Sequence, residues 1–131
     1  MKPFLSDNFL LQTKSPERLD YAFAADTAIF ASHCHLPVAE VGGNRKFDKL
    51  TAIRLNGDHY KWRAMRANGI AERFITGDAT DYEKFETWAA TVPKTLRNPL
   101  YLWTHLELKR CFGIGDKILN PDTAREIYDT G

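Results

Sequence analysis

The chain has 131 residues, of which 44% are hydrophobic and 12% aromatic, enough for one modest domain with a hydrophobic core. Charged residues make up 27% and the formal net charge is +1, a balance that argues against a nucleic-acid partner. Two cysteines are too few for a disulfide framework, and no stretch approaches the roughly 20 apolar residues of a membrane span. With no apolar signal-peptide stretch at the start, the expectation is a cytoplasmic protein with no membrane partner.

The first two predicted elements are a helix and a strand. Ser15-Pro16 is typical of an N-cap followed by the first residue of a helix. The apolar face of this helix would consist of Leu19, Ala22 and Phe23. Residues 29–34 then form an apolar run before Pro37, which predicts a short buried strand.

Helix signals dominate the rest of the chain. The predicted N-caps are Asp48, Asp58, Thr80 (in a capping box with Glu83), Asn98 and Asn120, the last two followed by proline. The helix from Asn98 is expected to end near Gly113. The apolar residues expected to face the core are Leu50, Ile53, Trp62, Met65, Phe85, Trp88, Ala89, Val92, Leu102, Trp103, Leu106, Ala124, Ile127 and Tyr128.

The predicted fold class is therefore mainly α, with one short buried strand. A lone buried strand cannot satisfy its own backbone hydrogen bonds, so it needs neighbours that this chain does not offer. Two interpretations stay open. The chain is the N-terminal piece of a longer protein, or it is a complete helical domain in which residues 29–34 are merely extended.

His33-Cys34-His35 is the first group of residues with potential chemistry. On a strand, His33 and His35 point to the same side and Cys34 to the other, where it would be a packing residue. Two neighbouring imidazoles are half of a divalent-metal site. The alternative is that both histidines are satisfied by backbone carbonyl groups in a helical core.

The second group is the block Gly57-Asp58-His59-Tyr60-Lys61-Trp62-Arg63-Ala64-Met65-Arg66. Arginine can bind a carboxylate through a bidentate fork, and histidine and tyrosine can orient or protonate hydroxyl groups. The alternative is an amphipathic helix whose Lys61, Arg63 and Arg66 lie in water. On the residues alone that alternative is favoured, except for His59 and Tyr60 at the helix start. The segment from Asn98 to Arg110 is interpreted as structural, with Lys94, Arg97, Lys109 and Arg110 exposed.

Both groups, together with the block Trp103-Thr104-His105-Leu106-Glu107-Leu108, resemble the uronate isomerase (glucuronate isomerase) family. That family belongs to the metal-dependent amidohydrolase superfamily of (β/α)8 TIM barrels. The resemblance implies that residues 1–37 hold an N-terminal helix and the first barrel strand. It implies that residues 38–131 belong to an inserted helical region.

The resemblance also implies a function and its residues. His33 and His35 would be metal ligands, with zinc as the expected divalent metal. His59 and Tyr60 would be catalytic, and His59, Tyr60 and Arg63 would bind the substrate. The full-length enzyme would interconvert aldose and ketose hexuronates, D-glucuronate with D-fructuronate and D-galacturonate with D-tagaturonate.

The family's chains are several times longer, and its remaining metal ligand has no counterpart here. The expectation is therefore an inactive fragment of a homo-oligomeric enzyme. The isolated fragment would associate with other copies through its unpaired strand. Two alternatives remain at this point. One is a metal-dependent hydrolase of the same superfamily, and the other is a non-catalytic helical interaction domain.

Overall fold

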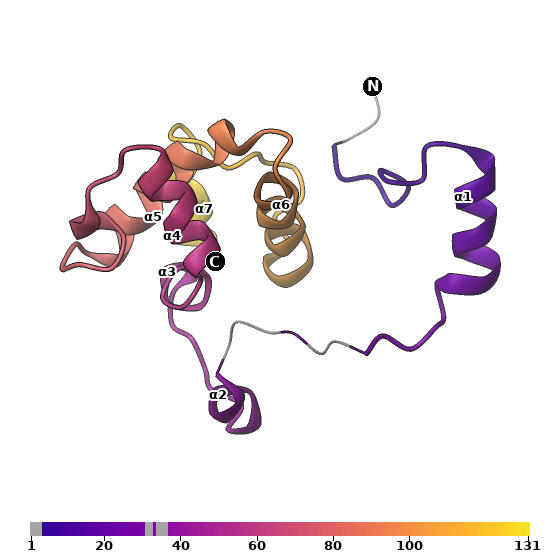
Figure 1. Ribbon diagram of the computed structural model, residues 1–131, viewed down its shortest axis with the longest axis horizontal. Coiled ribbons are helices and arrows are strands. Elements are labelled where there is room, and N and C mark those ends of the chain that lie inside the picture. The colour runs from indigo at the N-terminus through magenta and orange to yellow at the C-terminus, as the bar shows by residue number, and fades with distance from the viewer. Residues whose placement is uncertain (1–3, 31–32, 34–36) are drawn as a thin grey trace. The chain divides into compact units, whose positions relative to one another are not determined.

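Every regular element in the part of the chain that the computed structural model describes, residues 4–30, 33 and 37–131, is a helix (Figure 1). The chain divides into two units, Met1–Cys34 and His35–Gly131. The mainly helical fold class is confirmed. The proposed division at residue 37, between a barrel strand and an inserted region, stays a prediction.

The first unit contains helix α1 (Lys14–Leu19), which runs directly into a π-helical turn, η1 (Asp20–Ala24). The N-cap is Thr13 instead of Ser15, and its side chain makes no capping hydrogen bond. The predicted apolar face of this helix is in water, since Leu19 is 61% exposed and Phe23 is 71% exposed. Its apolar pattern therefore has no core to cover within this unit.

The predicted strand is not confirmed where the structure describes it. Residues 28–30 and 33 are irregular, and Ile29 and Phe30 are 91% and 95% exposed instead of buried. Residues 31–32 and 34–36, which complete the predicted strand, lie outside the described residues. The physical reason is that strand backbone needs a neighbouring strand for its hydrogen bonds, and no strand exists in the described ranges to supply them.

The second unit holds six α-helices and two short 3₁₀ turns in its described residues. The helices are α2 (Val38–Gly42), α3 (Leu50–Arg54), α4 (His59–Ala67), α5 (Asp81–Thr91), α6 (Pro99–Phe112) and α7 (Ala124–Thr130). The turns are η2 (Glu72–Phe74), between α4 and α5, and η3 (Val92–Thr95), which extends α5.

Three of the predicted helix starts are confirmed by their hydrogen bonds. The Thr80 hydroxyl accepts from the Glu83 N–H, and the Glu83 carboxylate accepts from the Thr80 N–H, which completes a capping box at α5. Asn98 caps α6 by accepting from the Leu100 N–H, and Asp58 caps α4. Helix α6 ends at Gly113, whose φ of +71° is a left-handed conformation that glycine adopts without strain.

Two predicted starts are displaced. Helix α3 is preceded by Lys49, which makes no side-chain cap, so Asp48 is not its N-cap. Helix α7 begins at Ala124, later than Asn120-Pro121 suggested. The Asn120 side chain accepts the N–H groups of Asp122 and Thr123, and this local turn competes with the helix.

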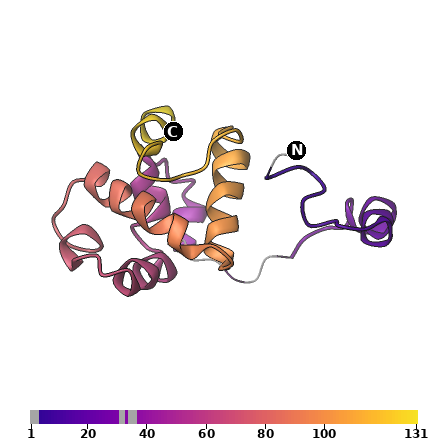
Figure 2. The same cartoon turned by 90° about the horizontal axis from the view of Figure 1, so that it is seen from above.

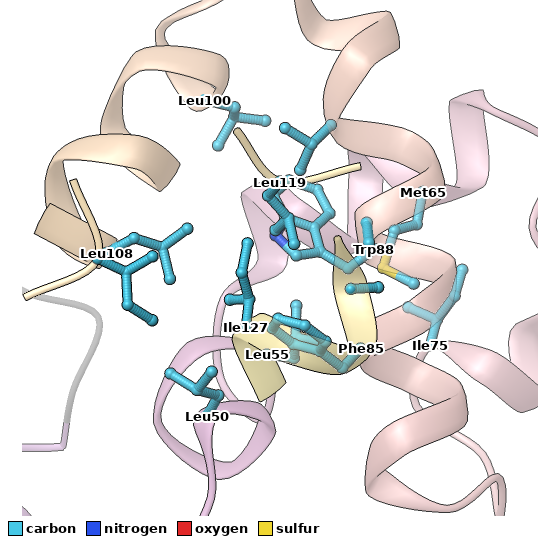
Figure 3. Close-up of a cluster of buried hydrophobic side chains, with 14 residues drawn as sticks. Leu50, Leu55, Met65, Ile75, Phe85, Trp88, Leu100, Leu108, Leu119 and Ile127 are labelled. Carbon is cyan, nitrogen blue, oxygen red and sulfur yellow. The ribbon is translucent and has the colours of Figure 1, made fainter. Parts of the chain in front are cut away.

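The core of the second unit is built around α5, which contacts α3, α4, α7 and η3 (Figures 1 and 2). Phe85, Trp88, Ala89 and Val92 are fully buried, as predicted. Figure 3 shows Phe85 and Trp88 within the cluster of apolar side chains. Around them pack the apolar residues Leu50, Leu55, Met65, Ile75, Leu100, Leu108, Ile114, Leu119, Ala124 and Ile127. Burying one such large side chain contributes about 1.5–3 kcal/mol, so this cluster is the main source of stability.

Helix α6 is rotated relative to the prediction. Its buried residues are Leu100, Thr104, His105 and Leu108, whereas Trp103 is 52% exposed. The buried histidine is satisfied on both sides, because its Nδ1 lies 2.6 Å from the Tyr101 carbonyl oxygen and its Nε2 accepts the Leu119 N–H at 3.0 Å. The Leu119 bond joins α6 to the segment before α7. Together the two bonds let a polar side chain occupy a core position that apolar periodicity does not reveal.

Within the described ranges, no helix combines the length and the apolar character that crossing a bilayer would require.

Candidate functional site

The first turn of α4 carries two of the residues that the sequence singles out. Asp58, the N-cap, accepts the Tyr60 N–H at 3.0 Å and the Lys61 N–H at 3.3 Å through the same carboxylate oxygen. This cap begins the helix at His59, so His59 and Tyr60 lie at its exposed N-terminal end.

The outer face of this turn brings three predicted site residues together. The rings of His59 and Tyr60 stack with their centroids 4.6 Å apart and their planes at 30°. The guanidinium of Arg63, one turn later, lies 5.5 Å from the centre of the Tyr60 ring. All three side chains are exposed, and Tyr60 is 42% so. Together they present an imidazole, a phenol and a guanidinium on one surface, a set that can bind hydroxyl groups and a carboxylate.

The inner face of the same turn holds a partly buried group of four charges, here called the charge cluster: Arg54, Asp58, Lys61 and Glu107. Arg54 Nη2 lies 2.5 Å from Glu107 Oε2. Lys61 Nζ lies 3.3 Å from Asp58 Oδ2 and 3.5 Å from Glu107 Oε2, and it donates to the Arg54 carbonyl at 3.1 Å. The cluster therefore connects the end of α3, the start of α4 and the middle of α6.

The cluster is largely out of water. Arg54 and Lys61 are each only 4% exposed, whereas 42% of the Glu107 side chain remains exposed. Arg54 Nε and Nη1 have no hydrogen-bond partner in the described part of the chain. Two buried donors without acceptors carry an uncompensated desolvation cost, so burying Arg54 at this position costs free energy of folding.

Burial and charge shift the pKa values of these groups. Burial, together with the neighbouring Arg54 charge, lowers the pKa of Lys61, and Glu107 and Asp58 oppose part of that effect. Burial likewise lowers the pKa of Arg54, against the opposing charge of Glu107. For Asp58, burial alone would raise the pKa, but the Lys61 charge and the hydrogen bonds from Lys61 and Tyr60 leave it lowered.

The structure corrects one sequence interpretation and adds two residues. Lys61 is not part of a solvated face, because its ammonium is buried against Glu107, whereas Arg63 and Arg66 are exposed as that interpretation required. Sequence reasoning missed Arg54 and Glu107. The available signal was a charge inside an apolar helical stretch, Leu50 to Leu55 for Arg54 and Leu102 to Leu108 for Glu107.

The predicted metal ligands are not brought together in the described residues. His33 is exposed on irregular backbone, and His35 lies outside the described residues. Imidazole suits zinc as a ligand, but a catalytic zinc site uses three protein ligands. The described residues contain no group of three histidine, cysteine, aspartate or glutamate side chains that could hold a metal ion. The described part of the chain therefore does not complete such a site.

Comparison with known proteins covers the entire chain. The family model described as glucuronate isomerase (UxaC) matches residues 1–131. The uronate isomerase of Yersinia enterocolitica is 57% identical over 131 residues, and that of Bacteroides thetaiotaomicron is 62% identical over 130 residues. A crystal structure of uronate isomerase from Thermotoga maritima matches 98% of this chain with a TM-score of 0.89 and 32% identity.

The match covers only part of each relative. The chain spans 28% of the length of these curated relatives and 28% of the Thermotoga maritima chain.

Proposed function

This chain belongs to the glucuronate isomerase family, and from that premise we propose that it is the N-terminal part of a hexuronate isomerase. The observation that carries the proposal is the family match over residues 1–131, with no segment of the chain left unexplained. The proposed substrates are D-glucuronate and D-galacturonate, which the complete enzyme would convert to D-fructuronate and D-tagaturonate.

The proposed substrate contacts are the exposed residues of the first turn of α4. Aldose–ketose isomerisation moves a hydrogen between C2 and C1 and a proton between the two oxygens. His59 and Tyr60 would bind the hydroxyl groups or relay that proton, and Arg63 would hold the carboxylate. Their support is geometric, since the His59 and Tyr60 rings stack at 4.6 Å and Arg63 lies beside them.

The proposed metal ligands are His33 and His35, which would act in the complete protein together with a ligand from outside this chain. A bound zinc ion would polarise sugar oxygens or anchor the carboxylate.

The proposed architecture is a (β/α)8 barrel in which residues 29–34 become the first strand once neighbouring strands are present. Residues 38–131 would then be the inserted helical region. A cytoplasmic location and a homo-oligomeric assembly belong to the same proposal, supported by the low cysteine count and by the exposed apolar residues of the first unit.

The test is isomerisation of D-glucuronate and D-galacturonate by the complete gene product, followed by NMR detection of the ketose. We expect activity in the complete protein, none in this 131-residue chain, and a large loss in His33→Ala. Cys34→Ser is the matched control, because in the proposed strand Cys34 would point away from the ligands, so activity should be retained.

A complete protein that converts neither hexuronate would contradict the proposal. Release of product from an ester or amide by the same preparation would then indicate a hydrolase.

A further inference from the structure

The charge cluster lies directly behind the first turn of α4, on the side opposite to His59, Tyr60 and Arg63. We propose that Glu107 and Arg54 are positioning residues, which set the place of Tyr60 and of the His59 ring stacked on it. This inference rests on the proposed isomerase function for its kinetic consequences.

A continuous series of contacts links Glu107 to Tyr60. Glu107 Oε2 contacts Lys61 Nζ at 3.5 Å, and Lys61 Nζ contacts Asp58 Oδ2 at 3.3 Å. The other oxygen of Asp58 accepts the Tyr60 N–H at 3.0 Å. Three ionic or hydrogen-bonded contacts therefore separate the α6 carboxylate from the backbone of the proposed substrate-binding residue.

Arg54 holds Glu107 in this arrangement. Its Nη2 lies 2.5 Å from the same Glu107 oxygen that contacts Lys61, and its carbonyl accepts from Lys61 Nζ at 3.1 Å. One residue further along, the Leu55 carbonyl accepts from Trp62 Nε1 at 2.6 Å. The carbonyls of Arg54, the last residue of α3, and of Leu55, its C-cap, are thus bonded to side chains of α4, which leaves the first turn of α4 little freedom to move.

Stability alone is a poor explanation for this arrangement. A buried ion pair often stabilises no better than apolar residues of the same volume, because desolvation offsets the attraction. Arg54 is an especially costly member, being 4% exposed with two donors that lack partners in the described residues. This desolvation cost is explained if the charge cluster holds the first turn of α4, with its exposed His59 and Tyr60, in a fixed geometry.

The experiment is a double-mutant cycle in the complete gene product, with kcat and KM for D-glucuronate as readouts. Glu107→Gln keeps the size of the side chain and removes its charge, and Tyr60→Phe removes the hydroxyl that the cluster is proposed to place. Glu72→Gln is the matched control, since it breaks an exposed ion pair of α4, Arg66 with Glu72 at 2.6 Å.

Glu107→Gln should lower kcat/KM about tenfold in the wild-type background, as expected for misplacement of a contacting residue. In the Tyr60→Phe background the loss should shrink to about twofold, because coupled positions are not additive. Glu72→Gln should leave both constants unchanged. Equal losses in the two backgrounds, or no loss at all, would overturn the proposal. If Glu107→Gln does not fold, Arg54→Lys is carried through the same cycle.

A second readout does not depend on activity. With ¹³C-labelled histidine in the complete protein, the ring current of Tyr60 displaces the His59 resonance, because the two rings are stacked. Glu107→Gln should move that resonance toward the position of an unstacked histidine, and Glu72→Gln should not. A shifted His59 resonance in a protein that converts no hexuronate would contradict the isomerase function but support the positioning role. An unshifted His59 resonance in an active enzyme would contradict the positioning role alone.

Discussion

His105 shows how one polar side chain can occupy a core position. Its Nε2 must accept the Leu119 N–H, so the proton of a neutral ring resides on Nδ1, which donates to the Tyr101 carbonyl. Burial lowers the pKa of His105, and the charge of Arg54 lowers it further, against the opposing effect of the Tyr101 carbonyl. The folded state therefore favours a neutral imidazole.

This preference predicts a pH dependence of stability. The unfolded histidine, with its pKa near 6.5, binds a proton more readily than the folded one. His105 therefore contributes full stability above about pH 6.5, and that contribution is lost as the pH falls below this value. The free energy of unfolding of the 131-residue chain, measured by urea denaturation between pH 8 and pH 5, should fall more steeply than that of the His105→Gln variant. The two slopes should differ by at most about 1.4 kcal/mol per pH unit. Parallel curves for the two proteins would contradict the prediction.

At the scale of the element, the helix ends that the sequence located correctly are those closed by a local cap. Capping at Thr80, Asn98 and Gly113 depends on local backbone geometry, so the residue type was enough to locate it. Which side of α6 faces the core depends on what His105 meets at Leu119, a contact 14 residues away that periodicity does not contain. The strand predicted at 29–34 is not confirmed and stays a prediction for the same reason, since a strand depends on its neighbours.

The same distinction between local relations and contacts across elements applies to the candidate site. The sequence grouped His59, Tyr60 and Arg63 within one turn of one helix, and the structure confirms that placement, whereas their roles stay a proposal. The sequence missed Arg54 and Glu107 because their role depends on the approach of α3 and α6 to α4. Lys61 was placed in water for the same reason.

The C-terminal cap of α6 yields a prediction about Gly113. Its φ is +71°, and a Cβ at this position would meet nothing within 4 Å, so the cost of Gly113→Ala is conformational only. We expect a loss of about 1 kcal/mol in the free energy of unfolding, measured by urea denaturation.

The control for Gly113→Ala is Gly42→Ala at the end of α2. Gly42 also has open space for a Cβ, but its φ is not positive. Alanine should therefore be tolerated there or stabilise slightly. Equal losses in the free energy of unfolding at the two positions would show that the positive φ of Gly113 is not the cause of its loss.

At the scale of the whole molecule, the two units differ in what they bury. The second unit has a continuous core, whereas the first exposes large apolar side chains along its length. These side chains are Leu10, Leu19, Tyr21, Phe23, Ile29 and Phe30, each more than half exposed. Apolar surface of this kind favours association.

We therefore predict that the 131-residue chain associates with a second copy of itself as its concentration rises, measured by sedimentation velocity. The double variant Phe23→Ser/Phe30→Ser should weaken this association. Leu96→Ser, which removes a 65% exposed side chain from the second unit, should not. A monomer at every concentration would refute the prediction, and an equal effect of Leu96→Ser would place the contact elsewhere.

Helix α3 has only five residues, too few to persist on its own. The carbonyls of its last residue, Arg54, and of its C-cap, Leu55, accept from Lys61 and Trp62 of α4. The two helices should consequently open to solvent as one cooperative unit. In native-state hydrogen exchange, the Leu55 amide, which is bonded to the Thr51 carbonyl at 2.9 Å, should exchange in the same opening event as the amides of α4. Transient exposure of α3 and rearrangement of the surface around His59 would then be one motion.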